Sequence, residues 1–270
     1  MSKKNALFVT QEMSPFTAIS EISEIVNKLP LHVHEKGMEI RVLMPRFGTI
    51  NERRHRLHEV VRLSGMNIIV DDDDFPLIIK VASLPGARIQ VYFLDNEEFF
   101  KRKSFFEDAD GNAYEDNIDR MVFFCKGVIE TVKKFGWPPN IIHCHGWMTS
   151  LVPFYLKTVY ENEPLFNDAK IIYSAYNNSL ENTFSDKFAD KASINNLTPE
   201  DLKAYQNKGK IHLQEGAIKY ADAVITGSSD LDKDLAKEIS KLKKPTLGYQ
   251  EDESMLSAYF DFYNQLLEES

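Results

Sequence analysis

Polar side chains stand directly after five apolar runs of strand type, where a ligand could be held. These positions are Gln11-Glu12-Met13, Pro45-Arg46, His145-Gly146, Tyr176-Asn177 and Ser228-Ser229. In an open parallel sheet, ligands bind in the crevice outside the carboxyl ends of the strands. Carboxylate, imidazole, phenol and amide groups there could hydrogen-bond a polar ligand. Their position indicates a cleft, but it does not by itself define a reaction.

His143 and His145 form a second arrangement that could do chemistry. They are two residues apart on one expected strand, so both side chains point to the same face. Two histidines placed in this way could bind a metal ion. No third ligand follows at a suggestive spacing, and structural hydrogen bonding is the favoured interpretation. We therefore expect no metal ion and no cofactor. The sequence also has no G-x-G-x-x-G, P-loop or G-x-S-x-G motif, and we assign no catalytic residue.

Short apolar runs alternate with longer segments of helical period, a pattern typical of βαβ units and a mostly parallel sheet. Strands are predicted at residues 6–10, 40–44, 141–145, 170–176 and 223–226. Helices are predicted at residues 19–35, 117–134, 147–160, 211–220 and 230–239. The predicted fold class is α/β, with a Rossmann-like sheet.

Two segments depart from this alternation. Three strand-like runs follow one another at residues 60–70, 77–84 and 89–94, separated by turn-forming residues. This spacing predicts a β-meander inserted at one edge of the sheet. The other segment is an aromatic-rich amphipathic stretch at 255–267, after a lysine-rich linker at 241–245. We expect it to be a helix packed on the body through Tyr259, Phe262 and Leu266.

Composition limits the partners and the compartment. The 270 residues are 43% hydrophobic and 27% charged, which is ordinary for a globular protein. The net charge of -9 argues against nucleic acid as a partner. No run approaches about 18 apolar residues, so no membrane span is expected. Cys125 and Cys144 lie in apolar segments, as in a reducing compartment. With no export signal visible, we expect a cytoplasmic protein.

The order of several short segments identifies a family resemblance. They are LFVTQEMSPF at 7–16, LP at 29–30, RVLMPRFG at 41–48, VYFLDN at 91–96, Asp116-Asn117 with Arg120, IIHCHGW at 141–147 and EGAIKYAD at 215–222. In this order they resemble the N-terminal half of bacterial glycogen and starch synthases. These enzymes form glycosyltransferase family 5 and use ADP-glucose. The resemblance covers about residues 5 to 240.

The resemblance implies a B-type glycosyltransferase, in which two Rossmann domains enclose the active-site cleft. The N-terminal domain mostly holds the glucan acceptor and the other holds most of the ADP-glucose. For this chain we expect residues 1–245 to form the N-terminal domain and 246–270 a helix that returns to it, without the second domain. The resemblance and the crevice rule together give five candidate cleft residues, which are Glu12, Glu24, His145, Tyr176 and Asn177.

Several family motif positions are occupied by different residue types. A Lys-Thr-Gly-Gly-Leu motif follows the first strand in the family, where the glycine amides approach the diphosphate and the lysine neutralises it. The lysine is Ala18 here, and the glycines are Ser20 and Glu21. A carboxylate at Glu21 would repel phosphate. The resemblance therefore implies a degenerate donor site.

Three further positions differ in the same way. The aspartate of the family's His-Asp-Trp is Gly146, and the histidine of its Thr-Ile-His-Asn is Tyr176. An acceptor-contacting Tyr-Gly pair aligns with Phe106 and Glu107. Residues of the scaffold match the family, whereas polar residues of the cleft do not.

The favoured hypothesis is a single-domain relative of glycogen synthase that serves α-glucan metabolism in a binding or regulatory role, without glucosyl transfer of its own. One alternative is an active ADP-glucose:α-1,4-glucan glucosyltransferase completed by a partner chain. Another is a protein-interaction module on a Rossmann scaffold. The expected partners are an α-glucan or a protein covering the cleft, including a second copy of the chain.

Overall fold

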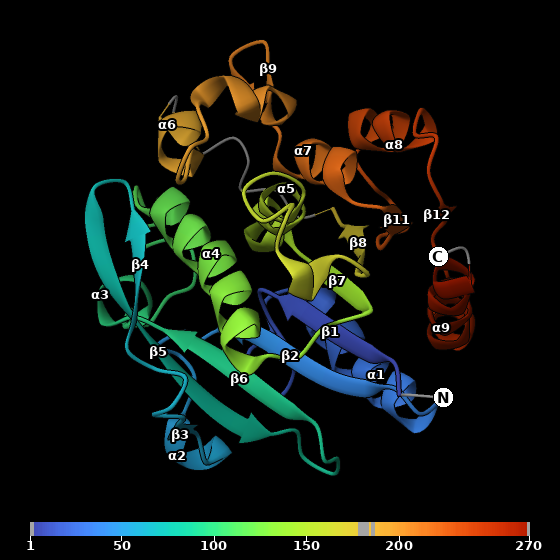
Figure 1. The fold of residues 1–270 in the computed structure, drawn as a ribbon, viewed down its shortest axis with the longest axis horizontal. Coiled ribbons are helices and arrows are strands. Elements are labelled where there is room, and N and C mark those ends of the chain that lie inside the picture. Colours follow the sequence, from blue (N-terminus) through green and yellow to red (C-terminus); the bar gives the residue numbers. More distant parts are fainter. Residues whose placement is uncertain (1–2, 178–183, 185–186, 269–270) are drawn as a thin grey trace.

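Strand β1 (Asn5–Thr10) lies inside the sheet, between β7 and β2. Every residue after Asn5 is buried, because protein covers both faces of the strand. The computed structural model describes residues 3–177, 184 and 187–268. Its main sheet has ten strands in the order β12-β11-β8-β7-β1-β2-β6-β5-β3, with β4 paired to β5 (Figure 1). Pairing is parallel from β12 to β6. The predicted α/β class with a mostly parallel sheet is confirmed.

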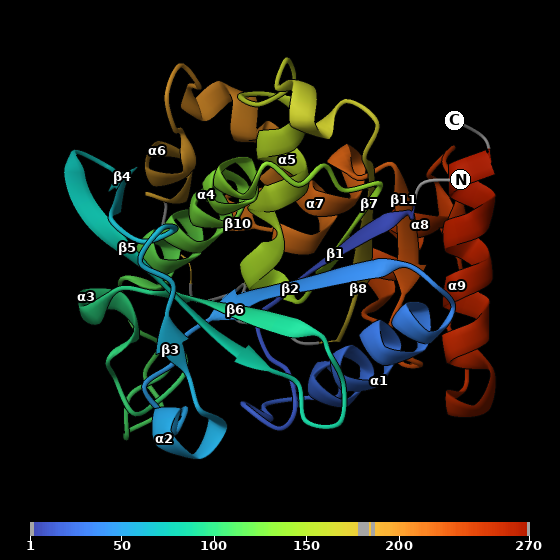
Figure 2. The ribbon, with the colours of Figure 1, turned by 60° about the horizontal axis from the view of Figure 1, so that its bottom comes forward.

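The remaining strands that pair in parallel are β2 (Glu39–Pro45), β6 (Gln90–Asp95), β7 (Ile141–His145), β8 (Lys170–Ala175), β11 (Ala223–Thr226) and β12 (Thr246–Leu247). The longer helices are α1 (Ile22–Glu35), α4 (Asn117–Phe135), α5 (Leu151–Lys157), α7 (Leu213–Tyr220), α8 (Lys233–Ser240) and α9 (Asp252–Glu268). Shorter elements are α2 (Glu52–His55), α3 (Glu97–Phe100), η1 (Trp147–Thr149), η2 (Pro164–Phe166), α6 (Phe188–Ala192), η4 (Pro199–Tyr205), and the hairpin β9 (Gln206–Asn207) and β10 (Lys210–Ile211). Figure 2 shows α4, α5 and α7 above the sheet and α1 below it.

The predicted meander is present, with one difference in its first strand. β4 (Met66–Val70), β5 (Asp73–Ser83) and β6 pair antiparallel in succession, and β6 also joins the parallel sheet through β2. The first predicted run begins at Met66 rather than Val60, and β3 (His58–Glu59) precedes it. Val61 is 78% exposed in a turn, because the chain bends there between β3 and β4.

Three predicted helices begin later than their apolar pattern suggests: α8 starts at Lys233 after its N-cap Asp232, and α1 and α7 start late because other bonds use their first residues. Ile19 and Ser20 donate their amides to Glu12, so α1 starts at Ile22. Ile211 pairs in the hairpin β9–β10, so α7 starts at Leu213. The predicted helix at 147–160 is shorter as well, since it divides into η1 and α5 and ends at Lys157.

The returning C-terminal helix is confirmed as α9. Its buried residues are Met255, Tyr259, Phe262, Tyr263 and Leu266, which follow a helical period. The helix packs beside α1, and the ring of Phe260 meets that of His32 edge-on at 6.2 Å. No described helix combines the length and the hydrophobicity needed to cross a bilayer.

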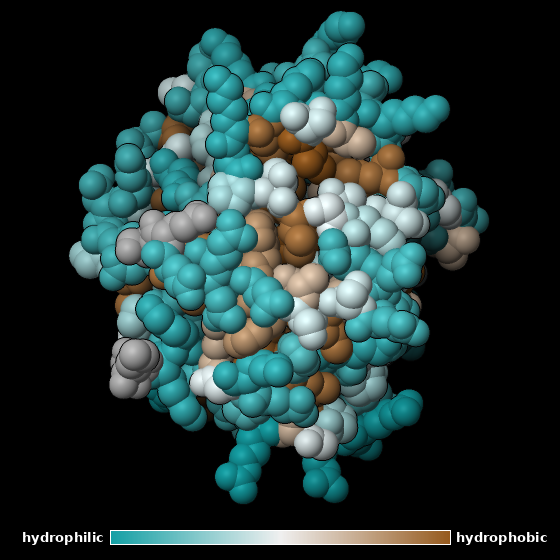
Figure 3. All heavy atoms as spheres, turned by 90° about the vertical axis from the view of Figure 1, so that its right-hand side faces the viewer, coloured by the Kyte–Doolittle hydropathy of each residue, from teal (hydrophilic) through white to brown (hydrophobic). Residues whose placement is uncertain are grey.

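The face that carries α9 and the β12 edge exposes apolar surface between polar side chains (Figure 3). Tyr249, between these two elements, is 43% exposed. Leu247, Leu256 and Phe260 are half-buried there. Part of the apolar surface on this side is therefore left exposed by the described residues.

Replacing Phe262 by alanine tests how strongly α9 is attached. Its side chain is 6% exposed, so Phe262→Ala removes a buried ring and is expected to cost about 3–5 kcal/mol of unfolding free energy. Urea denaturation followed by circular dichroism measures the loss. Asp261→Ala, on the exposed side of the same helix, should change the value by less than about 0.5 kcal/mol. Equal effects of the two variants would contradict this packing.

Candidate functional site

The loop after β1 is held by the carboxylate of Glu12, which is fully buried. Its Oε2 accepts the backbone amide of Ile19 at 2.6 Å and that of Ser20 at 2.7 Å. Its Oε1 accepts the Ser20 hydroxyl at 2.7 Å. A buried carboxylate needs such donors because it has lost its hydration. The amides in front of α1 are thus already bound to an internal anion.

A second carboxylate, Glu21, connects the loop before α1 to the residues that follow β11. Ser228, which follows β11, donates its hydroxyl to Glu21 Oε1. The backbone amide of Asn177 donates to the same Ser228 Oγ at 2.8 Å. The ends of β8 and β11 are therefore joined to the loop before α1. Two acidic side chains, Glu12 and Glu21, are thus part of the bonding of this loop.

Below these loops, His143 and His145 belong to a buried hydrogen-bonded cluster. The Nδ1 of His143 is 2.5 Å from the Tyr263 hydroxyl of α9, and its Nε2 is 2.7 Å from Ser174 Oγ. The Nδ1 of His145 is 2.8 Å from the Tyr176 hydroxyl. The two imidazole rings lie 3.8 Å apart between centroids. Among the described residues, no group of three His, Cys, Asp or Glu side chains could hold a metal ion.

Burial sets the protonation of this cluster. It lowers the pKa of His145 to about 3, and together with the neighbouring His145 it lowers the pKa of His143 well below the ordinary value. Burial raises the pKa of the Tyr176 and Tyr263 hydroxyls. All four side chains are consequently neutral near pH 7, as a desolvated cluster favours. The Nε2 atom of His145 is buried and lacks a partner within the described residues.

Tyr176, which directly follows β8, is a packed residue. Its amide donates to Gln214 Oε1 at 2.9 Å, and its carbonyl accepts Gln214 Nε2 at 2.7 Å. A Cβ atom on Gly227 would lie 2.3 Å from the Tyr176 ring. The side chain is fully buried, so its ring face is covered by protein and does not face a ligand.

Gly146 has a steric reason to be glycine. Its φ of 85° is left-handed, and a Cβ atom would lie 2.4 Å from Oε1 of Gln11. That Gln11 oxygen accepts the Met148 amide at 3.3 Å, and Gln11 Nε2 donates to Glu12. An aspartate at position 146 would displace Gln11 and, with it, a neighbour of Glu12.

Beside the loop lies a cavity of about 490 Å³. It is lined by Ile19, Lys103, Ser104, Phe105, Phe106, Glu107 and Asp108. Phe106 is buried, and its ring meets Trp147 edge-on at 4.8 Å. Asn117 Nδ2 donates a hydrogen bond of 2.8 Å to the Phe106 carbonyl and fixes its position. Glu107 and Asp108 are exposed at the rim, so carboxylates adjoin an aromatic wall.

The structure brings four of the five predicted cleft residues to the carboxyl ends of β1, β7 and β8. They are Glu12, His145, Tyr176 and Asn177, and His145 and Tyr176 are bonded directly. Glu24 is exposed in the first turn of α1, and no side-chain contact joins it to the others within the described residues. Sequence reasoning missed Gln214 and Tyr263, because nothing in their local pattern indicates partners on distant strands.

These features define an α/β domain in which polar side chains gather at the carboxyl ends of the parallel strands. Residues 5–248 match the family of the starch synthase catalytic domain, and the chain belongs to that family. It is 36% identical over 233 residues to a glycogen synthase of Pelodictyon phaeoclathratiforme and 38% identical over 232 residues to one of Chlorobaculum tepidum. Each alignment covers 84% of this chain and 47% of the relative. The chain thus spans about half the length of these curated relatives.

The fold is also similar to a solved structure, the catalytic domain of starch synthase IV from Arabidopsis thaliana bound to ADP and acarbose. The TM-score is 0.72 at 20% sequence identity. The similarity covers 92% of this chain and 51% of that one. At this identity the likeness supports the fold, and it agrees with the family assignment from sequence.

The buried histidines predict a pH dependence of stability. The unfolded chain protonates a histidine near pH 6.5, whereas the folded pKa values of His143 and His145 are depressed. Stability is therefore full above pH 6.5 and falls as the pH decreases, by about 1.4 kcal/mol per pH unit for each histidine. Urea unfolding at intervals between pH 7 and pH 5 measures the slope.

His145→Gln should reduce the slope of stability against pH by about 1.4 kcal/mol per pH unit, the share of one histidine, whatever it does to stability at pH 7. His58→Gln removes a histidine that is exposed in the fold and serves as the control, which should retain the full slope. A His145→Gln slope equal to that of the unmodified chain would show that His145 is not held neutral by burial.

Proposed function

We propose that this domain binds α-glucan in the cytoplasm and does not transfer glucose by itself. The observation that carries the proposal is the charge of the loop before α1, where Ala18 and Glu21 stand in place of the family's lysine and second glycine and where Glu12 binds the amides. In the family this loop receives the diphosphate of the sugar donor. Here the amides of Ile19 and Ser20 bind Glu12, and a phosphate that approached them would meet this carboxylate and that of Glu21.

The neighbouring residues act in the same direction. Ala18 offers no ammonium group where the family has lysine, and Glu21 adds a negative charge held by Ser228. Each missing charge-assisted contact is worth about 1.5–3 kcal/mol. The Arabidopsis enzyme was solved with ADP and acarbose. For the present domain we infer that only the carbohydrate class of ligand is retained.

The cavity of about 490 Å³ beside the loop is the proposed glucan site. Its wall contains Phe105, which is half-buried and can contact the apolar face of a sugar ring. Glu107 and Asp108 can accept hydrogen bonds from sugar hydroxyls at the rim. The free, buried thiols of Cys125 and Cys144 agree with a reducing, cytoplasmic setting.

Calorimetry on the 270-residue chain tests the donor side of the proposal. ADP-glucose should bind no more tightly than about 1 mM, because the contacts to its diphosphate are missing. In parallel, the chain is incubated with labelled ADP-glucose and maltoheptaose. Incorporation of label into the glucan, or micromolar affinity for ADP-glucose, would contradict the proposal and favour the active glucosyltransferase.

Maltoheptaose titration tests the acceptor side. Amide shifts are expected at Ile19 and along residues 103–108. Glu107→Ala should weaken binding about fivefold to tenfold, because a rim acceptor of sugar hydroxyls is lost. Asp110→Ala changes an exposed carboxylate of the same loop outside the cavity, and binding should be unchanged. Equal weakening by both variants would place the glucan elsewhere.

A second candidate function, a protein-interaction module, is favoured by the apolar surface around Tyr249 and the β12 edge. Surface of this kind marks contacts with a partner or a second copy. Sedimentation of the chain across a concentration series tests self-association. A monomer at every concentration, with glucan binding intact, would leave the glucan-binding proposal as the one supported.

A further inference from the structure

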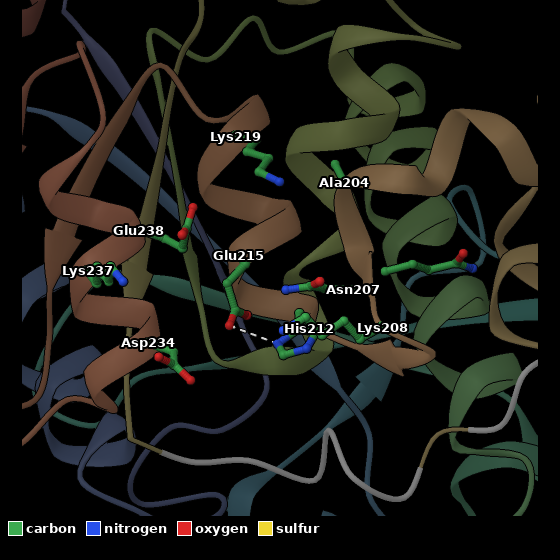
Figure 4. A pocket seen from close by; sticks show the side chains of 10 residues that line it. Ala204, Asn207, Lys208, His212, Glu215, Lys219, Asp234, Lys237 and Glu238 are labelled. Atoms are coloured by element: carbon green, nitrogen blue, oxygen red, sulfur yellow. Dashed lines mark hydrogen bonds and ion pairs between the residues drawn. The ribbon is translucent and has the colours of Figure 1, made fainter.

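A second cavity, of about 510 Å³, lies in the helix layer between α7, α8 and the β9–β10 hairpin (Figure 4). It is lined by Ala204, Gln206, Asn207, Lys208, His212, Glu215, Lys219, Asp234, Lys237 and Glu238. None of these residues lines the cavity proposed for glucan. Its volume falls within the range of small-molecule sites, which is about 300–1,000 Å³.

Lysine ammonium groups surround the cavity without being neutralised in pairs. Lys208, Lys219 and Lys237 make no salt bridge within 4.0 Å among the described residues. Lys219 and Lys237 come from facing helices (Figure 4). Glu238 also lines the cavity, and its pKa is lowered. The main cause is the hydrogen bond from Lys241, and the positive charges of Lys219 and Lys237 lower it further. These cations could receive an anionic group.

One carboxylate that lines the cavity, Glu215, lacks a hydrogen-bond donor. Glu215 is 12% exposed, and its Oε1 lies 3.0 Å from His212 Nδ1. Its Oε2 is buried and has no partner within the described part of the chain. A buried carboxylate oxygen without a donor is unfavourable, so a rotation of the Glu215 side chain that brings Oε2 to the cavity and to a ligand hydroxyl would be favoured. Asp234 and Asn207 offer further acceptors beside it.

These two properties restrict the ligand. A bare anion would meet Glu215, Asp234 and Glu238, which repel it, whereas a neutral sugar would leave the lysines unused. No Phe, Tyr or Trp is among the residues described as lining the cavity, so the imidazole of His212 is the one ring that these residues offer to a nucleobase. We propose that the cavity binds a small polyhydroxylated phosphate ester, of the size of a hexose monophosphate. This inference is independent of the glucan-binding proposal.

Calorimetry of the full chain with fructose 6-phosphate as the probe tests the inference, with inorganic phosphate and free fructose as separate ligands. Fructose 6-phosphate is expected to bind saturably and at least about tenfold more tightly than either of its parts, because only the ester uses both the lysines and Glu215. Absence of saturable binding would overturn the proposal. Equal affinity for inorganic phosphate would also overturn it, since the hydroxyls would then contribute nothing.

Variants assign the site. Lys219→Met with Lys237→Met should weaken fructose 6-phosphate binding by about tenfold or more. Glu215→Gln should weaken binding of the ester but not of inorganic phosphate, because one oxygen that accepts from the sugar hydroxyls becomes an amide donor, whereas the lost charge only removes a repulsion of phosphate. Lys203→Met is the matched control, since Lys203 is an exposed lysine of the adjacent η4 that pairs with Glu200 and does not line the cavity. Binding that survives the double variant, or falls equally with Lys203→Met, would exclude this cavity.

Discussion

A buried carboxylate at the end of the central strand is the constraint on which the cleft depends. Glu12 has no contact with solvent, so its charge is stable only because donors surround it. The loop before α1 supplies those donors from Ile19 and Ser20. This bonding fixes the path of the loop and delays the start of α1 to Ile22. It also holds Glu21 where Ser228 can reach it.

The scaffold beneath the cleft is ordered by polar groups that satisfy one another. Tyr263 of α9 bonds to His143, and His145 bonds to Tyr176, so the returning helix and the end of β8 share one buried cluster. Gln214 of α7 then fixes the Tyr176 backbone. Because each of these side chains is removed from water, a lost partner leaves a costly unsatisfied group. The cluster thus couples helices that are far apart in sequence.

Periodicity predicted the sheet and the returning helix well, because burial on both faces of strands such as β1 and β7 leaves continuous apolar runs. It placed the start of α1 too early, since no local pattern reveals that Glu12 competes for the first amides. The resemblance indicated that Gly146 and Tyr176 differ from the family. Why they do so required the tertiary structure, because Gln11 and Gln214 reach them from elsewhere in the fold.

The central claim is that the loop before α1 no longer has the residues that bind the donor diphosphate, since Ala18, Ser20 and Glu21 replace the family's lysine and two glycines. The most direct measurement restores the family residues through Ala18→Lys, Ser20→Gly and Glu21→Gly in one chain and compares ADP binding by calorimetry with the unmodified chain. The account predicts at least about a tenfold gain in affinity, because an ammonium contact is added and a repulsive charge is removed. An unmodified chain that binds ADP as tightly as the triple variant would contradict it.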